Sequence, residues 1–301
     1  MAFVQLGADN KVLKESIQSK LAAAKKEPCD AKLYDFDDIF YRLFVDPDDR
    51  TKLLIELTTP NWSAIRKKGA EDRISEVLKD WVKSFNDDGA SFVVPLDDEK
   101  TCSKSVEIAE AFSKLRMYAL GGPLYQYCKA LQTGNALKES FDFKLRRDTY
   151  CWIVPKGDRI AVVFGFEFPI KTDRIIGNQI LTEFLEVRRQ KDLQSAPVIA
   201  YSKDAPAELK GCKMPSFDKE AFLGYFTILL LPSHVKGTKI DKTVENVIGF
   251  RSYLTYHIKC AKAFFHQSMR ARVKKMLQIL NRARYEPDDK RKKKKIIKGA
   301  K

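Results

Sequence analysis

The sequence of 301 residues lacks most of the signatures of a nucleotide-dependent, membrane-spanning or secreted protein. It contains neither the GxxxxGKS or GxxxxGKT motif nor GxGxxG, so it has no recognisable phosphate-binding loop. No apolar run approaches the roughly 18 residues that a bilayer-spanning helix needs. The first residues also lack the basic and apolar regions of a secretory signal. We therefore expect neither a nucleotide site nor a membrane span.

Cysteine and histidine are sparse: six scattered cysteines form no CxxC pair, and there are only three histidines. His257 and Cys260 would share a helix face, but two ligands do not make a zinc site and a Cys–His nucleophile needs a third, orienting group. Asp35, Asp37 and Asp38 alternate faces if they lie in a strand, and we expect them at a solvated edge. The sequence therefore predicts a noncatalytic protein with no metal or other cofactor. Its cysteines should be reduced, as in the cytoplasm or nucleus.

Positive charge is in excess and is unevenly distributed. The net charge is +15, and residues 270–301 hold fourteen Lys or Arg against three acids, which leaves only +4 for the rest of the chain. Such an end should attract a polyanion or an acidic protein surface. The tail from Lys290, which we expect to be disordered, has three readings: a solvated end, a nuclear-localisation-like patch or a polyanion-binding arm.

Apolar periodicity predicts two successive sets of strands and helices. Strands are expected at 32–44 (one or two), 52–58, 91–95, 141–145, 150–154, 160–166, 198–201 and 222–231, and helices at 10–25, 60–82, 104–131 and 173–189. Gly121-Gly122-Pro123 should break or kink the helix at 104–131. Because strands and helices do not alternate strictly, the fold class is α+β, with two similar two-layer α/β domains built on antiparallel sheets. We expect the domains at 1–134 and 135–240, a long helix at 241–284 and a basic tail at 285–301.

The expected helix at 241–284 is amphipathic, with Asp241 as a candidate cap. It would be about 66 Å long, whereas a domain of ~150 residues has a radius of gyration of about 15 Å. Its second half must therefore project or lie on another chain, unless the helix bends back as two helices onto its own domain. A soluble monomer seldom exposes so large an apolar stripe, so a partner helix or groove is expected to cover it. The candidate partner-packing residues are Phe265, Met269, Val273, Met276, Leu277 and Leu280.

The other face of this helix is basic. Its candidate binding residues are Arg270, Arg272, Lys274, Lys275, Arg282 and Arg284. They could form a solvated face favoured by the C-terminal end of the helix dipole. Their density favours contact with an acidic surface instead.

Several segments resemble the 34 kDa subunit (subunit 2) family of the actin-related protein 2/3 complex. They are 256–263, His266, 269–272 and 280–284 in the helix, and 158–160, 162–164, Ile176-Gly177, Glu183-Phe184, Arg188-Arg189, Ala196-Pro197 and 208–210 upstream, with a weaker match at 35–37 before Tyr41. The resemblance is specific over about 150–284 and diffuse before it. Residues 85–140 and the Lys-rich tail depart from the family, and Gly121-Gly122-Pro123 falls where the family has an unbroken helix.

The resemblance implies a noncatalytic core scaffold that pairs with the 20 kDa subunit 4 and with other subunits of the complex. It also implies binding to the side of an actin filament, from which a branch is nucleated, in the cytoplasmic actin cytoskeleton of cell projections or cortex. The apolar stripe would then pack on subunit 4, and the basic face would meet acidic actin. The alternative is a basic nucleic-acid-binding module. Because the aromatic residues fall on apolar faces rather than among the basic residues, no nucleic-acid partner is expected.

Overall fold

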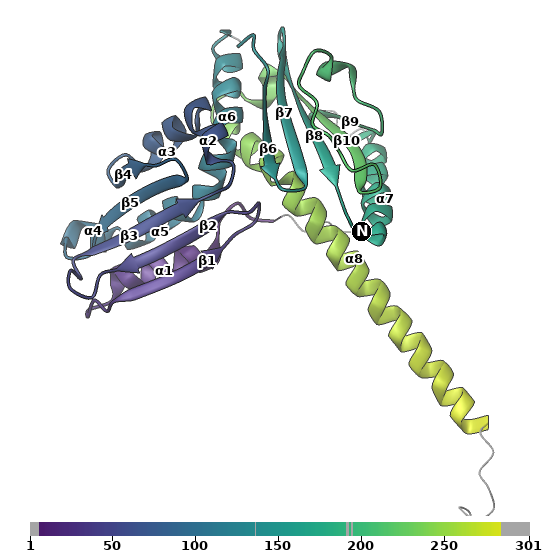
Figure 1. The fold of residues 1–301 in the computed structure, drawn as a ribbon, viewed down its shortest axis with the longest axis horizontal. Helices are drawn as coiled ribbons and strands as arrows, with labels where there is room; N and C mark the ends of the chain where they lie inside the picture. The colour runs from purple at the N-terminus through teal and green to yellow at the C-terminus, as the bar shows by residue number, and fades with distance from the viewer. Residues whose placement is uncertain (1–5, 136, 191–192, 194, 284–301) are drawn as a thin grey trace, which may run out of the picture. The chain divides into compact units, whose positions relative to one another are not determined.

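The computed structural model describes residues 6–135, 137–190, 193 and 195–283. The chain up to Tyr256 forms one compact unit, and the chain from His257 onward forms another. The first unit contains two five-stranded antiparallel sheets with the orders β1-β2-β3-β5-β4 and β6-β7-β8-β10-β9 (Figure 1). The repeated strand order confirms the predicted α+β fold with two similar sheets. The domain boundaries at 134 and 240 stay predictions.

The first sheet and its helices come from the N-terminal part of the chain. In order, the elements are α1 (Lys11–Ala22), β1 (Cys29–Tyr34), β2 (Phe40–Val45), β3 (Lys52–Thr58), α2 (Trp62–Ile65), a 3₁₀ turn (Arg66–Lys68), α3 (Ala70–Leu78), β4 (Val82–Phe85), β5 (Gly89–Pro95), α4 (Glu99–Ser103), α5 (Ser105–Ser113) and α6 (Leu115–Gln132). Asn10 caps α1 by accepting a hydrogen bond from the Leu13 amide at 2.9 Å. Alternate residues of β2 and β3 are buried, as expected when one face of a sheet packs against helices.

Two expectations for this region are wrong. Residues 60–82 are not one helix, because Gly69 adopts φ 109° between the 3₁₀ turn and α3, and Val82 already begins β4. The break in the expected helix at 104–131 falls at Lys114, and α6 runs through Gly121-Gly122-Pro123. Small residues are required there because a Cβ on Gly122 would lie 2.6 Å from Cα of Ala70. The glycine therefore serves close helix packing rather than a turn.

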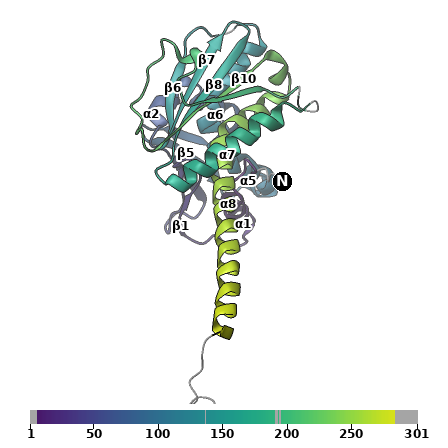
Figure 2. The ribbon, with the colours of Figure 1, turned by 90° about the vertical axis from the view of Figure 1, so that its right-hand side faces the viewer.

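The second sheet repeats this arrangement. Its elements are β6 (Phe141–Arg146), β7 (Thr149–Lys156), β8 (Arg159–Glu167), α7 (Lys171–Arg188), β9 (Val198–Ser202), a 3₁₀ turn (Ala207–Leu209), β10 (Phe222–Leu230), a second 3₁₀ turn (Pro232–His234) and α8 (Lys239–Ala283). Figure 2 shows α7 running across this sheet. The ring of Phe250, from the first part of α8, stacks on Phe226 of β10 with centroids 4.4 Å apart. Both helices thus cover the same face, where Phe184 of α7 also meets Phe250 at 5.8 Å.

Each repeat buries an arginine of its last helix against an aspartate of its first hairpin. In the first repeat, Arg116 of α6 pairs with Asp37 at 2.7 Å. In the second, Arg251 of α8 pairs with Asp148 at 3.0 Å. Both guanidinium groups also lie near a phenylalanine ring, Phe36 at 5.4 Å and Phe168 at 4.1 Å respectively. Burial lowers the pKa of Arg251, and Asp148 opposes that shift by favouring its charged form.

The solvated edge expected for Asp35, Asp37 and Asp38 is therefore wrong for Asp37, which is 1% exposed. Asp37 and Asp38 do not lie in a strand, because both adopt positive φ, 64° and 58°, in the turn between β1 and β2. This turn directs the Asp37 carboxylate towards Arg116 and towards Ser252, whose hydroxyl approaches it at 3.1 Å. Since Arg251 and Ser252 are adjacent on α8, the first hairpins of both sheets are anchored to one turn of that helix.

Candidate partner-binding surface

The helix α8 is continuous from Lys239 to Ala283, a run of 45 residues about 68 Å long. It is not divided into two helices, so the alternative in which it bends back is wrong. Asp241 lies in the first turn of the helix rather than at its cap, where its charge favours the N-terminal end of the dipole. From His257 onward the helix belongs to the second compact unit.

All six candidate partner-packing residues are exposed within this chain, by between 50% and 63%. We call them the apolar stripe: Phe265, Met269, Val273, Met276, Leu277 and Leu280. At about 100° per residue, their directions fall within an arc of about 120° around the helix axis. Six large apolar side chains in one arc form a surface of the kind that soluble proteins normally cover.

The sequence pattern missed two further apolar side chains on this part of the helix. Phe264 and Ile279 are 64% and 58% exposed, and both point outside the apolar stripe. Phe264 is adjacent to Phe265, with ring centroids 6.1 Å apart, yet its side chain leaves the helix about 100° away from that of Phe265. Phe264 directly precedes Phe265 and so falls outside the three-and-four spacing, whereas Ile279 lies three residues after Met276 but points about 40° beyond the edge of the arc.

The basic residues lie on the rest of the helix circumference. Arg270, Arg272, Lys274, Lys275 and Arg282 are all exposed, and we call this set the basic arc. Arg284 and the tail at 285–301 lie outside the described residues.

No Asp or Glu occurs between Glu245 and Glu286, so the basic arc has no carboxylate on its own helix to pair with. Like charges four residues apart, as at Arg270 and Lys274, destabilise a helix by about 0.2–0.5 kcal/mol per pair. The helix dipole favours Arg282, which lies in the last turn, but its effect does not extend to residues 270–275 further back along the helix. An acidic surface placed against the arc would offset the repulsion between these like charges.

Comparison with known proteins shows which family this chain belongs to. The family described as "Arp2/3 complex, 34 kD subunit p34-Arc" matches residues 55–287, which begin within β3 and include the whole of the second sheet and all of α8. The chain belongs to this family. The chain is also similar to "Actin-related protein 2/3 complex subunit 2" of Dictyostelium discoideum, with 30% identity over 84% of each chain. It is 29% identical to "Actin-related protein 2/3 complex subunit 2A" of Arabidopsis thaliana, over 85% of this chain and 83% of the relative.

The p34-Arc family is that of a structural subunit of the Arp2/3 complex, which nucleates actin, rather than of a known enzyme. Among the described residues, no three His, Cys, Asp or Glu side chains gather as a metal ion would require. Within the same ranges, no helix combines the length and the apolar character needed to cross a membrane. The candidate site of this p34-Arc chain is therefore the exposed surface of α8, whose apolar stripe and basic arc both lie inside the matched region.

Proposed function

We propose that this p34-Arc chain is a noncatalytic core scaffold of the Arp2/3 complex that also binds the side of an actin filament. In this proposal, the apolar stripe of α8 packs against subunit 4, the 20 kDa subunit, and the basic arc faces the filament from which a branch grows. The chain would act in the cytoplasmic actin cytoskeleton, in cell projections or the cortex. One observation carries the proposal: a single continuous helix exposes an apolar arc and an acid-free basic arc within the family-matched region.

The pairing with subunit 4 can be tested with two neighbouring phenylalanines. Phe265 lies in the apolar stripe and Phe264 does not, although their exposed fractions are similar, at 55% and 64%. Covering the exposed half of a Phe contributes about 1–2 kcal/mol, which corresponds to about 5- to 30-fold in affinity. We expect Phe265→Ser to weaken subunit 4 binding by this factor in a titration, and Phe264→Ser to leave it within about twofold. Equal losses from both variants would contradict the assignment of the stripe.

Filament binding can be tested by reversing the charge of the basic arc. We expect Arg270→Glu, Arg272→Glu, Lys274→Glu and Lys275→Glu, combined in one complex, to abolish cosedimentation with actin filaments. The matched control makes the same change at four exposed lysines of the first domain: Lys67, Lys79, Lys83 and Lys104. It alters the net charge equally and should pellet like the unmodified complex. Unchanged pelleting of the arc variant would remove these residues from the filament interface.

The rival function is nucleic-acid binding. Its best support is Phe264, an exposed aromatic residue on the basic side of α8. A stacking platform for single strands places aromatic rings under successive bases, and one ring does not provide this. In one buffer, the scaffold proposal expects the complex to bind actin filaments more tightly than single-stranded RNA. The reverse order, with strong salt dependence, would favour the rival.

A further inference from the structure

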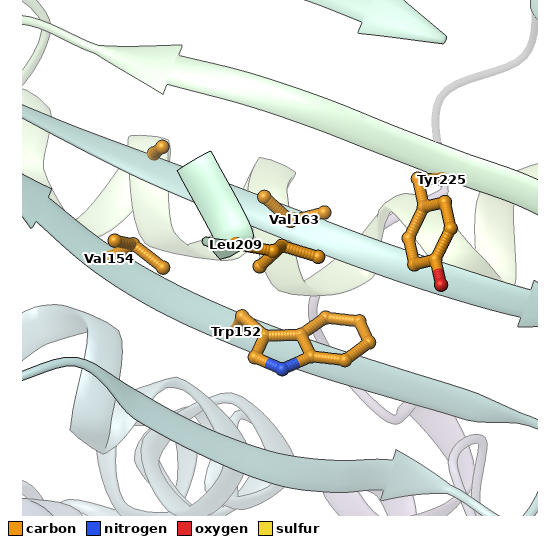
Figure 3. Close-up of a cluster of buried hydrophobic side chains, with 6 residues drawn as sticks. Trp152, Val154, Val163, Leu209 and Tyr225 are labelled. Atoms are coloured by element: carbon orange, nitrogen blue, oxygen red, sulfur yellow. The ribbon is translucent and has the colours of Figure 1, made fainter. Parts of the chain in front are cut away.

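The two sheets share a strand order, but within the part of the chain that the structure describes, only the second has a segment across its helix-free face. The connection between β9 and β10 runs from 203 to 221. Its Leu209 is buried in a cluster with Trp152, Val154, Ala161, Val163 and Tyr225, most of which are labelled in Figure 3. The Trp152 indole donates a hydrogen bond to the Lys213 carbonyl at 3.1 Å, and Phe217 lies 6.3 Å from the Trp152 ring. This segment therefore covers the helix-free face of the second sheet.

No segment among the described residues covers the corresponding face of the first sheet. The connection between β4 and β5 spans only 86–88, which is too short to cross the sheet. Helices α1, α4 and α5 lie on one side of the sheet, and no described helix or strand crosses the other side (Figure 1). On that bare side, Phe40, Phe44, Leu54 and Val93 are only partly buried. Tyr34 is 83% exposed there, with its ring 5.1 Å from that of Phe40.

Strand register arranges this bare face in rows. One apolar row joins Phe44, Leu54 and Val93, which are partners across β2, β3 and β5. A second contains Tyr34 and Phe40, which are partners across β1 and β2. Adjacent strands are about 4.8 Å apart, so a chain crossing the three strands of the first row would contact side chains over about 10 Å. These two rows are the apolar part of the face that such a segment could contact.

Between the two apolar rows, Lys32, Arg42 and Glu56 form a charged row, and Asp30 lies beside it as the partner of Phe44, so two cations and two carboxylates balance in number. Arg42 makes hydrogen bonds of 2.9 and 3.0 Å to Asp30 and lies 3.6 Å from Glu56. Its guanidinium also covers the ring of Phe44 at 4.8 Å. Aromatic rings beside an arginine resemble a nucleic-acid-binding sheet, but Asp30 and Glu56 balance Arg42 and Lys32 here, so these four residues leave no net positive charge to attract phosphates. The face therefore suits an uncharged, apolar partner rather than a polyanion.

We propose that the bare face of the first sheet binds an extended, uncharged segment of another subunit of the complex, in the way that residues 203–221 cover the second sheet. The two sheets share a strand order, and the apolar rows of the first sheet are the side chains that such a segment would cover, as residues 203–221 cover Trp152, Val163 and Tyr225. The second sheet is covered by a segment of its own chain, and the first sheet would be covered by a segment of another subunit. The inference rests on the proposed scaffold function, because it requires the assembled complex.

Site-specific photo-crosslinking in the reconstituted complex tests this proposal. A p-benzoyl-phenylalanine placed at Phe44 should crosslink to a non-helical segment of another subunit. The same probe at Val106, on α5 and 50% exposed, is the control and should give at least tenfold less product with that segment. A complex that assembles normally but gives no crosslink from position 44, or crosslinks only within the same chain or to added single-stranded RNA, would overturn the proposal. Failure of the complex to assemble would instead count against the scaffold function.

A matched pair of valine variants provides the second measurement. Val93→Glu puts a charge into an apolar row of the bare face and should lower the crosslink yield from position 44 at least fivefold. Val106→Glu makes the same change elsewhere in the domain and should leave that yield unchanged. Circular dichroism of each variant checks that it is folded. If Val93→Glu does not fold, Tyr34→Glu, at the most exposed side chain of the face, replaces it with the same expected loss. An undiminished yield in a folded variant would refute the proposal.

Discussion

Asp37 lies where the first hairpin meets α6 and α8, and its replacement should destabilise the chain strongly. Its carboxylate accepts a 2.7 Å bond from Arg116 and contacts the Ser252 hydroxyl at 3.1 and 3.2 Å. Arg116 is itself 3% exposed, so Asp37→Ala would leave a buried cation with only Asp35, at 3.6 Å, as a counter-charge. Removing one partner of a buried pair typically costs about 3–5 kcal/mol. The positive φ of 64° adds about 1 kcal/mol for alanine, which tolerates that conformation less well than Asp or Asn.

Asp37→Asn removes the negative charge of the side chain but nearly keeps its shape. Asparagine tolerates positive φ and can still bond to Ser252, so the expected loss is smaller, about 2–4 kcal/mol. Asp38→Asn is the control, because Asp38 has a similar φ of 58° but, among the described residues, its carboxylate accepts a single 3.2 Å bond from the Arg147 amide. It should cost less than about 1 kcal/mol. Urea unfolding of the purified chain measures all three variants. A loss below about 1 kcal/mol for Asp37→Ala would refute the claim that this buried pair anchors the hairpin.

Three other changes test packing, titration and thiol burial. Gly122→Ala should destabilise the chain by about 1–3 kcal/mol in the same urea assay, because its Cβ would lie 2.6 Å from backbone atoms. Gly249→Ala should instead stabilise α8 by up to about 1 kcal/mol, because the nearest atom, in Met117, is 3.5 Å from the new Cβ. Burial lowers the pKa of His234, so the stability that its neutral form provides is complete above the unfolded value of about 6.5 and falls as pH drops below it. His234→Gln should therefore reduce the loss of unfolding free energy between pH 7 and pH 5, and an unchanged slope would contradict this. Burial raises the pKa of Cys128 to about 12, whereas Cys260 is exposed. Iodoacetamide at pH 8 should therefore label Cys260 in the native chain and leave Cys128 unmodified until urea is added. Mass spectrometry of the peptides measures both reactions.

Much of the secondary structure could be predicted from the sequence, because local periodicity reflects which face of an element is buried. The strand expected at 52–58 is β3 at those bounds, and the long helix expected at 241–284 is α8 from Lys239 to Ala283. The apolar stripe was also predictable, since its spacing is a property of one helix. The stretch at 60–82 was not, because the α3–β4 boundary carries no strong local break and β4 is set by pairing with β5.

The resemblance in α8 and upstream segments was enough to predict the family from the sequence, and the family match at 55–287 confirms it. Which residues touch subunit 4 or actin stays a prediction, because the residues that bind another chain are defined by that chain as well. The exposed fractions of the stripe and arc establish only that these side chains are available within this chain.

By itself, the sequence determined most of the elements, the repetition of strands followed by helices and the two faces of α8, since each depends on residues close together along the chain. Only the tertiary structure decided that Asp37 is buried rather than solvated, because its partner Ser252 lies 215 residues away. It also decided that Gly122 lies inside a helix, where α6 approaches α3 too closely for a Cβ. The same holds for the bare face of the first sheet: alternation marks two faces on a strand, but only packing shows which of them the described residues leave uncovered.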